Sequence, residues 1–291
     1  MDSPMLVLAV DTCLEPGSLA LLREGGPSLA EASEGGEMET VPLPPGWRST
    51  ALHEEILRLL ARHGWSTKDI AGYGVTTGPG SFTGVRLGLT AVKGLAEVHG
   101  KPIFPVSTLE VLAAAAVANP GRDRERAVTN PSRDREGAVA DDSDKWTATS
   151  DEPKLPAAGS LVTGHSSLVT AFAPVLDARR GQIFGAVYQV ERDEFRPLLE
   201  ETVCALRTFL ARIQAAGLQE VRFCGTDLAP FLPEIEQAGW AAGSAIPVSP
   251  HLAGVLAQIA LRRLQKGLGV SVLAADANYV RASDAELFWK E

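Results

Sequence analysis

Cysteine is scarce in this chain: only Cys13, Cys204 and Cys224 occur among 291 residues. An odd number of widely spaced cysteines excludes a disulfide framework and does not match the ligand spacing of a zinc site. No apolar run approaches the roughly 20 residues of a membrane-spanning helix, and the first residues lack the features of a signal peptide. We therefore expect a cytoplasmic protein with no membrane association. Cys13 is interpreted as a buried, inert thiol, with a reactive thiol as the alternative.

Positive charge is also limited, because 27 Lys and Arg stand against 36 Asp and Glu and give a net charge of −9. Direct binding of nucleic acid relies on clustered Lys and Arg, and the chain shows no such stripe. On a nucleic-acid pathway, a partner would therefore supply most of the binding. The five histidines form no His-x-x-x-His pair, and neither a Gly-x-Ser-x-Gly elbow nor a Walker A motif occurs. We predict no metal site in this chain.

Two stretches far apart in the chain share one pattern. Residues 6–10 form a short apolar strand ending in Asp11, and residues 18–22 return after a Pro-Gly turn. Residues 173–176 end in Asp177, a glycine-containing turn follows, and residues 182–189 return. The repetition predicts two related lobes, each opening with a β-hairpin.

The remaining elements follow from periodicity and turn residues. We predict a poorly defined third strand over 27–38 and further strands over 73–77, 103–106, 197–203 and 221–225. Helices are predicted over 50–63, 83–99, 108–118, 205–216 and 250–265.

Residues 119–170 interrupt this pattern. Arg-Asp-Arg-Glu occurs twice, and seven basic and nine acidic residues nearly cancel. Such a stretch cannot bury enough apolar surface to offset its ordering entropy. We interpret it as a disordered insertion, with a basic nucleic-acid arm as the alternative. The expected organisation is a first lobe over 1–118, this insertion, and a second lobe over 171–291, whose C-terminal helix could pack back on the first lobe.

Residues 78–86, Gly-Pro-Gly-Ser-Phe-Thr-Gly-Val-Arg, join a predicted strand to a predicted helix. Gly78 and Gly80 allow a sharp turn, and Ser81 or Thr83 can cap the helix. The N–H groups at the helix start, with Arg86 one turn later, could hold an anion such as a phosphate. The alternative is a capped turn without a ligand.

Two further features have both a structural and a functional interpretation. Asp11 and Asp177 could face each other across a cleft and hold a metal–nucleotide through water, or could simply start their hairpin turns. In the helix over 83–99, one side carries Gly84, Gly88, Ala91 and Leu95. Such small residues indicate close packing, either on the chain's own sheet or on a helix of another subunit.

In this order, these motifs resemble the bacterial TsaB (YeaZ) family. The resemblance rests on Ala-Val-Asp-Thr at 9–12, His-Glu at 53–54, the glycine motif at 78–86, Pro-Val-Ser-Thr-Leu-Glu at 105–110, Leu-Asp-Ala-Arg-Arg-Gly-Gln-Ile-Phe at 176–184, and Asn-Tyr-Val-Arg near the end. It covers nearly all of the chain outside 119–170. It implies an α/β architecture of the actin-like ATPase (ribonuclease H-like) class, with two related lobes of mixed sheet flanked by helices.

The resemblance also implies a function. Family members assist the biosynthesis of threonylcarbamoyladenosine, a tRNA base beside the anticodon. They are accessory subunits that pair with a catalytic TsaD-like subunit, which carries the ATP and metal, and a TsaE-like ATPase completes the system. We accordingly expect no catalytic residue or cofactor in the isolated chain, and tRNA contact through the complex. The free chain could be a homodimer.

The resemblance places the pairing surface on the helices over 50–63 and 83–99. The expected interface residues are His53, Ile56, Leu60, Gly84, Gly88, Ala91 and Leu95. The expected nucleotide or anion contacts are Asp11, Gly78, Gly80, Ser81, Thr83 and Arg86.

Two other functions remain open at this point. An independent ATPase or sugar-kinase-like enzyme of the same fold would need Asp11 and Asp177 to hold metal–nucleotide. A peptidase would need a nucleophile–base pair or a metal, and the sequence shows no such arrangement.

Overall fold

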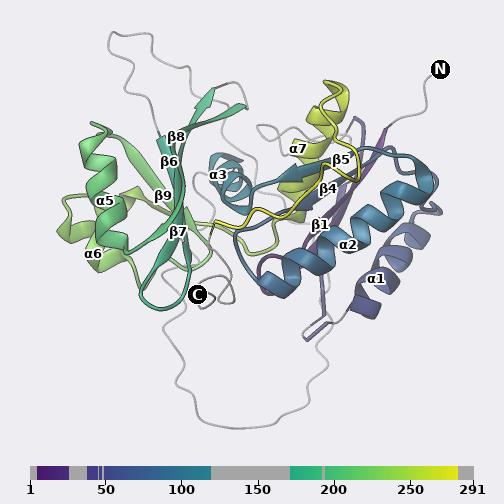
Figure 1. The fold of residues 1–291 in the computed structure, drawn as a ribbon, viewed down its shortest axis with the longest axis horizontal. Coiled ribbons are helices and arrows are strands. Elements are labelled where there is room, and N and C mark those ends of the chain that lie inside the picture. Colours follow the sequence, from purple (N-terminus) through teal and green to yellow (C-terminus); the bar gives the residue numbers. More distant parts are fainter. Residues whose placement is uncertain are drawn as a thin grey trace, which may run out of the picture.

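Two five-stranded sheets lie side by side in the computed structural model, which describes residues 5–25, 38–44, 46–47, 49–118, 171–191 and 194–280 (Figure 1). The first lobe contains β1 (Leu6–Asp11), β2 (Ser18–Arg23), β3 (Met38–Pro42), α1 (Ser49–Arg62), β4 (Gly72–Thr76), α2 (Phe82–His99) and β5 (Ile103–Val106). The helix α3 (Thr108–Ala118) leads toward the second lobe. That lobe contains β6 (Ala171–Asp177), β7 (Ile183–Glu191), β8 (Glu194–Cys204), α5 (Leu206–Ala215), β9 (Val221–Gly225), α6 (Leu232–Gln237), η1 (Ala242–Ser244) and β10 (Ala245–Pro247), before α7 (Ala253–Gln265).

The two sheets have the same topology. The first has the order β3-β2-β1-β4-β5 and the second the order β8-β7-β6-β9-β10. In both, the first three strands form an antiparallel meander, and the last two lie parallel to the first strand. The duplication predicted from the two hairpins is confirmed, and the fold is the two-lobe actin-like (ribonuclease H-like) architecture.

The central strand β1 is buried along its whole length because helices cover both faces of its sheet. Leu6, Leu8 and Val10 pack with the apolar sides of α1 and α2. Val7 and Ala9, on the opposite face, pack with α3 and α7. The alternation of side chains along a strand thus assigns each face of β1 to a different pair of helices.

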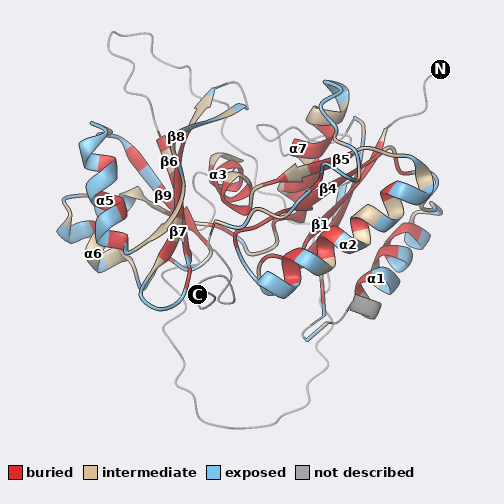
Figure 2. Ribbon diagram, viewed as in Figure 1, coloured by how far each residue is buried: buried red, intermediate tan, exposed pale blue. Residues whose placement is uncertain are grey.

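The helices α3 and α7 join the cores of the two lobes. The alanine-rich α3 is buried on nearly all sides, and it contacts α7 and the second sheet. One apolar cluster consequently runs from the first sheet through these helices to Leu176, Ala186 and Tyr188 of the second (Figure 2). Although α7 follows the second lobe in sequence, it packs on β1, β2 and β4 of the first.

The elements differ from the sequence-based expectations at the third strand and in the second lobe. The third strand is β3 at Met38–Pro42, and residues 26–37, which hold most of the stretch expected to form it, lie outside the described residues. The short elements α6 and β10 were not predicted. The expected insertion over 119–170 and residues 281–291 also lie outside the described residues.

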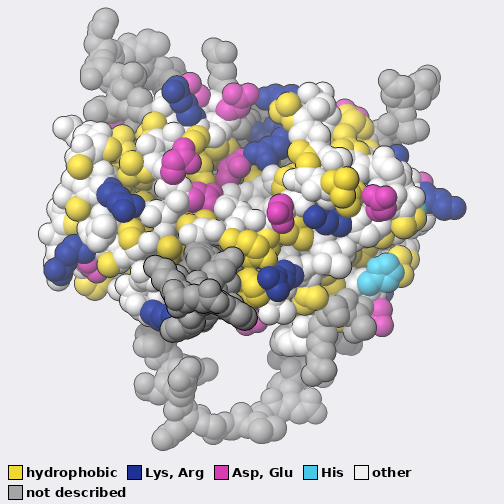
Figure 3. Space-filling model, in the orientation of Figure 1, with side chains coloured by type: hydrophobic (Ala, Val, Ile, Leu, Met, Phe, Trp, Pro, Cys, Tyr) yellow, Lys and Arg dark blue, Asp and Glu magenta, His cyan; other side chains and the backbone are white. Residues whose placement is uncertain are grey.

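Charges of both signs are interspersed over the face of the molecule shown in Figure 3, where Lys and Arg of the described residues lie among Asp and Glu. The described residues on this face therefore form no extended basic surface for a nucleic acid backbone, which needs clustered cations.

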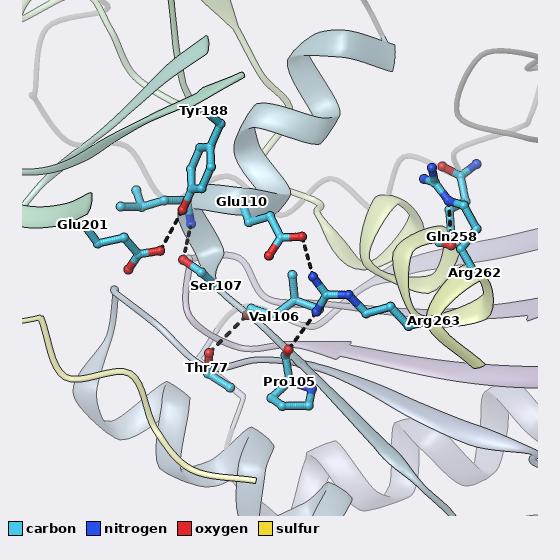
Figure 4. A network of polar contacts seen from close by, with 11 residues as sticks. Thr77, Pro105, Val106, Ser107, Glu110, Tyr188, Glu201, Gln258, Arg262 and Arg263 are labelled. Carbon is cyan, nitrogen blue, oxygen red and sulfur yellow. Dashed lines mark hydrogen bonds and ion pairs between the residues drawn. The ribbon is translucent and has the colours of Figure 1, made fainter. Parts of the chain in front are cut away.

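Polar contacts lie beside this shared core (Figure 4), and a side-chain hydrogen bond between Tyr188 of β7 and Ser107, just before α3, links the two lobes. The hydroxyl of Tyr188 in β7 donates to Glu201 Oε1 in β8 at 2.8 Å. In the other lobe, Arg263 of α7 donates to Glu110 Oε1 of α3 at 2.6 Å and to the Pro105 carbonyl at 3.0 Å. Burial raises the pKa of Glu110, and the Arg263 charge opposes that rise.

Candidate functional site

A cleft of about 1130 Å³ lies where the two lobes meet. The first lobe contributes the turn after β1 and the glycine turn before α2, and the second lobe contributes the turn after β6. The segment that follows α7 runs along one side. The lining residues are Cys13, Leu14, Glu15, Pro79, Gly80, Ser81, Phe82, Val85, Arg86, Leu176, Asp177, Ala178, Arg179, Phe184, Thr226, Asn278, Tyr279 and Val280.

The glycine turn is packed tightly onto the turn that follows β1. The Ser81 N–H donates to the Cys13 carbonyl at 2.8 Å, and a Cβ at Gly80 would collide with that same carbonyl. Gly78 has a φ of 105°, which favours glycine. The predicted cap is confirmed for Ser81, whose hydroxyl accepts from the Gly84 N–H at 3.2 Å, while Thr83 is exposed and does not line the cleft. Gly80, Ser81 and Arg86 do line it.

Asp11 does not face the cleft. Its side chain is fully buried, and Oδ1 accepts from the Thr76 hydroxyl at 2.7 Å and from the Cys13 N–H at 3.1 Å. Oδ2 has no hydrogen-bond partner among the described residues. Burial raises the pKa of Asp11 to about 6, and the two hydrogen bonds oppose this effect. The Asp11 carboxyl joins β1 to β4 inside the lobe and is not among the residues that line the cleft, so its expected contact with a nucleotide or anion stays a prediction.

Cys13 is an inert thiol in this setting, although its backbone borders the cleft. The side chain is buried, and its Sγ lies 3.5 Å from the Thr76 carbonyl oxygen. Burial, together with the neighbouring Asp11 charge, raises the pKa of the thiol to about 12. Because the thiolate is the reactive form, this environment suppresses nucleophilic chemistry.

Asp177 occupies the equivalent position in the second lobe but is exposed. Its Oδ1 accepts from the Arg179 N–H at 2.7 Å, and its Oδ2 lies 3.3 Å from the Arg179 guanidinium. This is the turn-starting role of a short polar side chain. The pair of carboxylates imagined across the cleft is therefore not formed, since only Asp177 lines it.

The glycines of α2 pack against their own chain. The Thr12 hydroxyl donates to the Gly84 carbonyl at 2.7 Å. A Cβ at Gly84 would collide with the Thr12 backbone carbonyl, and one at Gly88 with the Thr12 hydroxyl oxygen. These contacts match the alternative in which Gly84 and Gly88 pack on their own chain, because the turn after β1 leaves no room for a side chain.

Most of the other expected interface residues also pack inside the chain. Ile56 and Leu60 of α1 are buried beneath the helix, so neither is available to a partner. Ala91 and Leu95 of α2 are half-buried against the same core, whereas His53 is exposed. The periodicity correctly identified the apolar side of each helix, but that side faces the first sheet.

Arg86 is exposed at the mouth of the cleft and is held by two aromatic residues. Its guanidinium carbon lies 3.8 Å from the centroid of the Phe82 ring. Its Nε donates to the Tyr279 hydroxyl at 3.1 Å. The Phe82 and Tyr279 rings themselves lie 5.5 Å apart between centroids. The orientation of the guanidinium is thus fixed from within the chain.

Comparison with known proteins gives a consistent result. A family model for TsaD, tRNA N6-adenosine threonylcarbamoyltransferase, matches residues 49–127. The chain is 34% identical over 120 residues to the tRNA threonylcarbamoyladenosine biosynthesis protein TsaB of Escherichia coli K12, a match that covers 41% of this chain and about half, 48%, of that protein. It is 25% identical over 287 residues to the protein of the same name from Bacillus subtilis 168, covering 99% of each. The structure of YeaZ from Pseudomonas aeruginosa shares the fold, with a TM-score of 0.62, 22% identity, and coverage of 94% of this chain and 99% of that one.

Over nearly its whole length, the chain is thus similar to proteins of the TsaB (YeaZ) family. Sequence reasoning missed the residues that the segment after α7 brings to the cleft. Asn278 donates its side-chain N–H to Glu201 Oε2 at 2.6 Å and its backbone N–H to the Thr77 carbonyl at 2.8 Å, so it touches both lobes. Tyr279 reaches Arg86 across 193 positions of sequence. Nothing in the periodicity signals these contacts, and only the motif Asn-Tyr-Val-Arg pointed to this segment.

Metal ligands and membrane spans were sought among the described residues. Among them, no group of three or more His, Cys, Asp or Glu side chains is placed to hold a metal ion. None of the helices in the described ranges has the length and hydrophobicity that crossing a membrane requires.

Proposed function

We propose that this chain is a non-catalytic subunit in the biosynthesis of tRNA threonylcarbamoyladenosine and that it pairs with a TsaD-like threonylcarbamoyltransferase subunit. The observation that carries the proposal is the full-length match to a relative named for this pathway. The match of residues 49–127 to the transferase family adds that the partner and this chain share part of their fold. Two chains of related architecture can pair through equivalent helices.

The accessory role is supported by the state of the first-lobe carboxyl. A metal–nucleotide held between the lobes would need Asp11 in the cleft, yet this side chain is buried and bonded to Thr76 and Cys13. We therefore assign ATP and metal to the TsaD-like subunit. A TsaE-like ATPase would complete the system, and tRNA would be contacted through the complex, in keeping with the net charge of −9.

The pairing surface that we propose is the outer side of α1 and α2. Leu57 of α1 is 44% exposed and Val98 of α2 is 77% exposed. At Gly94, also on α2, a Cβ would meet no atom within 4 Å, so the backbone there is open to close approach. Together with the exposed His53, these residues replace the buried positions that the sequence had suggested.

The test is size-exclusion chromatography with light scattering, using this chain and the TsaD-like subunit of its own organism, with and without ATP. We expect a one-to-one complex. Leu57→Asp should weaken it by about tenfold or more, because a charge would be buried in the interface. Leu268→Asp is the matched control, since Leu268 is 58% exposed but follows α7. Absence of a complex would contradict the proposal, and the same run of the free chain shows whether it is a homodimer.

The competing function is an independent ATPase, and the feature in its favour is the cleft between the lobes. Its requirement for both carboxylates is not met in this conformation, because Asp177 pairs with Arg179 and Asp11 is buried. Binding of ATP by the isolated chain, without any complex, would revive it.

A further inference from the structure

Arg86 is arranged as a receptor before any partner binds. The Phe82 ring covers one face of its guanidinium, and the Tyr279 hydroxyl accepts a hydrogen bond from its Nε–H. Both rings are about half-exposed, at 45% for Phe82 and 49% for Tyr279. Because its orientation is already set, the arginine loses little side-chain entropy on forming a further bond. We call Phe82, Arg86 and Tyr279 the arginine anchor.

The two terminal guanidinium nitrogens of Arg86 have no carboxylate partner among the described residues. Two other exposed arginines of the described residues do have one: Arg58 pairs with Glu54, and Arg179 pairs with Asp177. A planar guanidinium with both terminal nitrogens available matches an anion that presents two oxygens side by side. The anchor is therefore suited to a carboxylate or a phosphate.

The surroundings of the anchor favour a single carboxylate over a phosphate chain. Glu15 and Asp177 line the same cleft, and Arg179 is already engaged by Asp177. A nucleic acid backbone carries regularly spaced charges and requires several cations, so these carboxylates would repel it. The rest of the lining includes apolar side chains, among them Leu14, Leu176 and Phe184. Such walls fit a protein segment with one acidic residue between apolar ones.

We propose that the arginine anchor binds a carboxylate of the TsaD-like subunit, carried on a segment whose neighbouring side chains are apolar and enter the mouth of the inter-lobe cleft. This inference rests on the proposed function, since the segment belongs to that subunit. It extends the contact beyond the outer side of α1 and α2 to the N-terminal end of α2 and to the segment after α7.

The test measures the affinity of the full-length chain for the TsaD-like subunit by calorimetry, at low and at high salt. Arg86→Ala should weaken binding by about 30-fold, as expected for a central arginine in an interface. Arg86→Lys keeps the charge but loses the two-oxygen geometry, and should weaken binding by about tenfold. Tyr279→Phe removes only the orienting hydroxyl and should cost a few-fold. Arg207→Ala, an exposed arginine of α5 in the second lobe, is the control and should leave binding unchanged.

The outcomes separate this inference from the proposed function. If the wild-type chain binds and Arg86→Ala binds equally well, the anchor is wrong while the pairing stands. If the loss in Arg86→Ala is the same at both salt concentrations, the residue acts by packing and the carboxylate is wrong. If the substitution alters binding of inorganic phosphate or of tRNA and not of the subunit, the occupant is a phosphate. A wild-type chain that does not bind the subunit overturns both proposals.

Discussion

Replacement of Asp11 by Asn tests the buried carboxyl directly. The folded chain holds the pKa of Asp11 at about 6, against 3.8 for an ordinary carboxyl. A difference of about two pKa units is worth about 3 kcal/mol, at about 1.4 kcal/mol for each unit. Because the folded state binds this proton more tightly than the unfolded state, the protonated form stabilises the fold at low pH. That stability is present below pH 4 and is lost as the pH rises to about 6.

The assay is urea unfolding of the wild type and Asp11→Asn between pH 4 and pH 7. Asn keeps the acceptor for Thr76 and Cys13 but does not titrate, so the two unfolding free energies should diverge by about 3 kcal/mol across this range, with the wild type losing stability. Asp69→Asn is the control: hydrogen bonds from Ser66 lower the pKa of this exposed carboxyl, so it cannot produce that loss. If the difference between the two unfolding free energies does not change with pH, the Asp11 carboxyl does not have a raised pKa in the folded chain. Divergence in the opposite direction would show that a positive charge compensates Asp11.

Three further predictions concern packing and reactivity. Gly88→Ala should destabilise the isolated chain by about 1–3 kcal/mol, because the added methyl group would collide with the Thr12 hydroxyl. Gly94→Ala on the same helix should stabilise the chain by up to about 1 kcal/mol. Thermal unfolding measures both effects, and equal unfolding temperatures for the two variants would indicate that these glycines face a partner and do not pack inside the chain. Native thiol labelling at pH 8 should modify Cys204 quickly and the buried Cys13 and Cys224 slowly; rapid loss of three thiols without denaturant would contradict the burial. Glu201→Ala should cost about 1–3 kcal/mol in urea unfolding, because the Tyr188 hydroxyl and the Asn278 amide lose their acceptor; an unchanged midpoint would show that the lobes do not depend on this link.

The duplicated fold was predictable because it is encoded locally. Each hairpin has an apolar strand, an aspartate and a turn within about 20 residues, and such short-range patterns reflect the alternation of a strand and the dihedral needs of a turn. The helices α2 and α3 were placed within one residue for the same reason. The position of the third strand was predicted wrongly because β3 lies at the sheet edge, where only alternate residues are half-buried and the apolar signal is weak.

The candidate site was less predictable because its contacts join distant parts of the chain. A glycine stripe says that something approaches closely, but not what: here it is Thr12, 72 positions before Gly84. The aspartate at the end of β1 has the same sequence context whether it faces a cleft or a core. Only the fold shows that Thr76 bonds to it, and only the fold places Tyr279 against Arg86.

The position of α7 has a consequence for how the chain is made. The first sheet is synthesised early, yet the face that carries Val7 and Ala9 is covered by a helix near the end of the sequence. A hydrogen bond also joins α7 to the first sheet, because the Ser18 hydroxyl of β2 accepts from the Ala253 N–H at the start of α7. By contrast, the outer face of the second sheet finds α5 and α6 within its own stretch. On the ribosome, the first lobe is therefore completed only after the second lobe has emerged, and its apolar face stays open to chaperones until α7 follows.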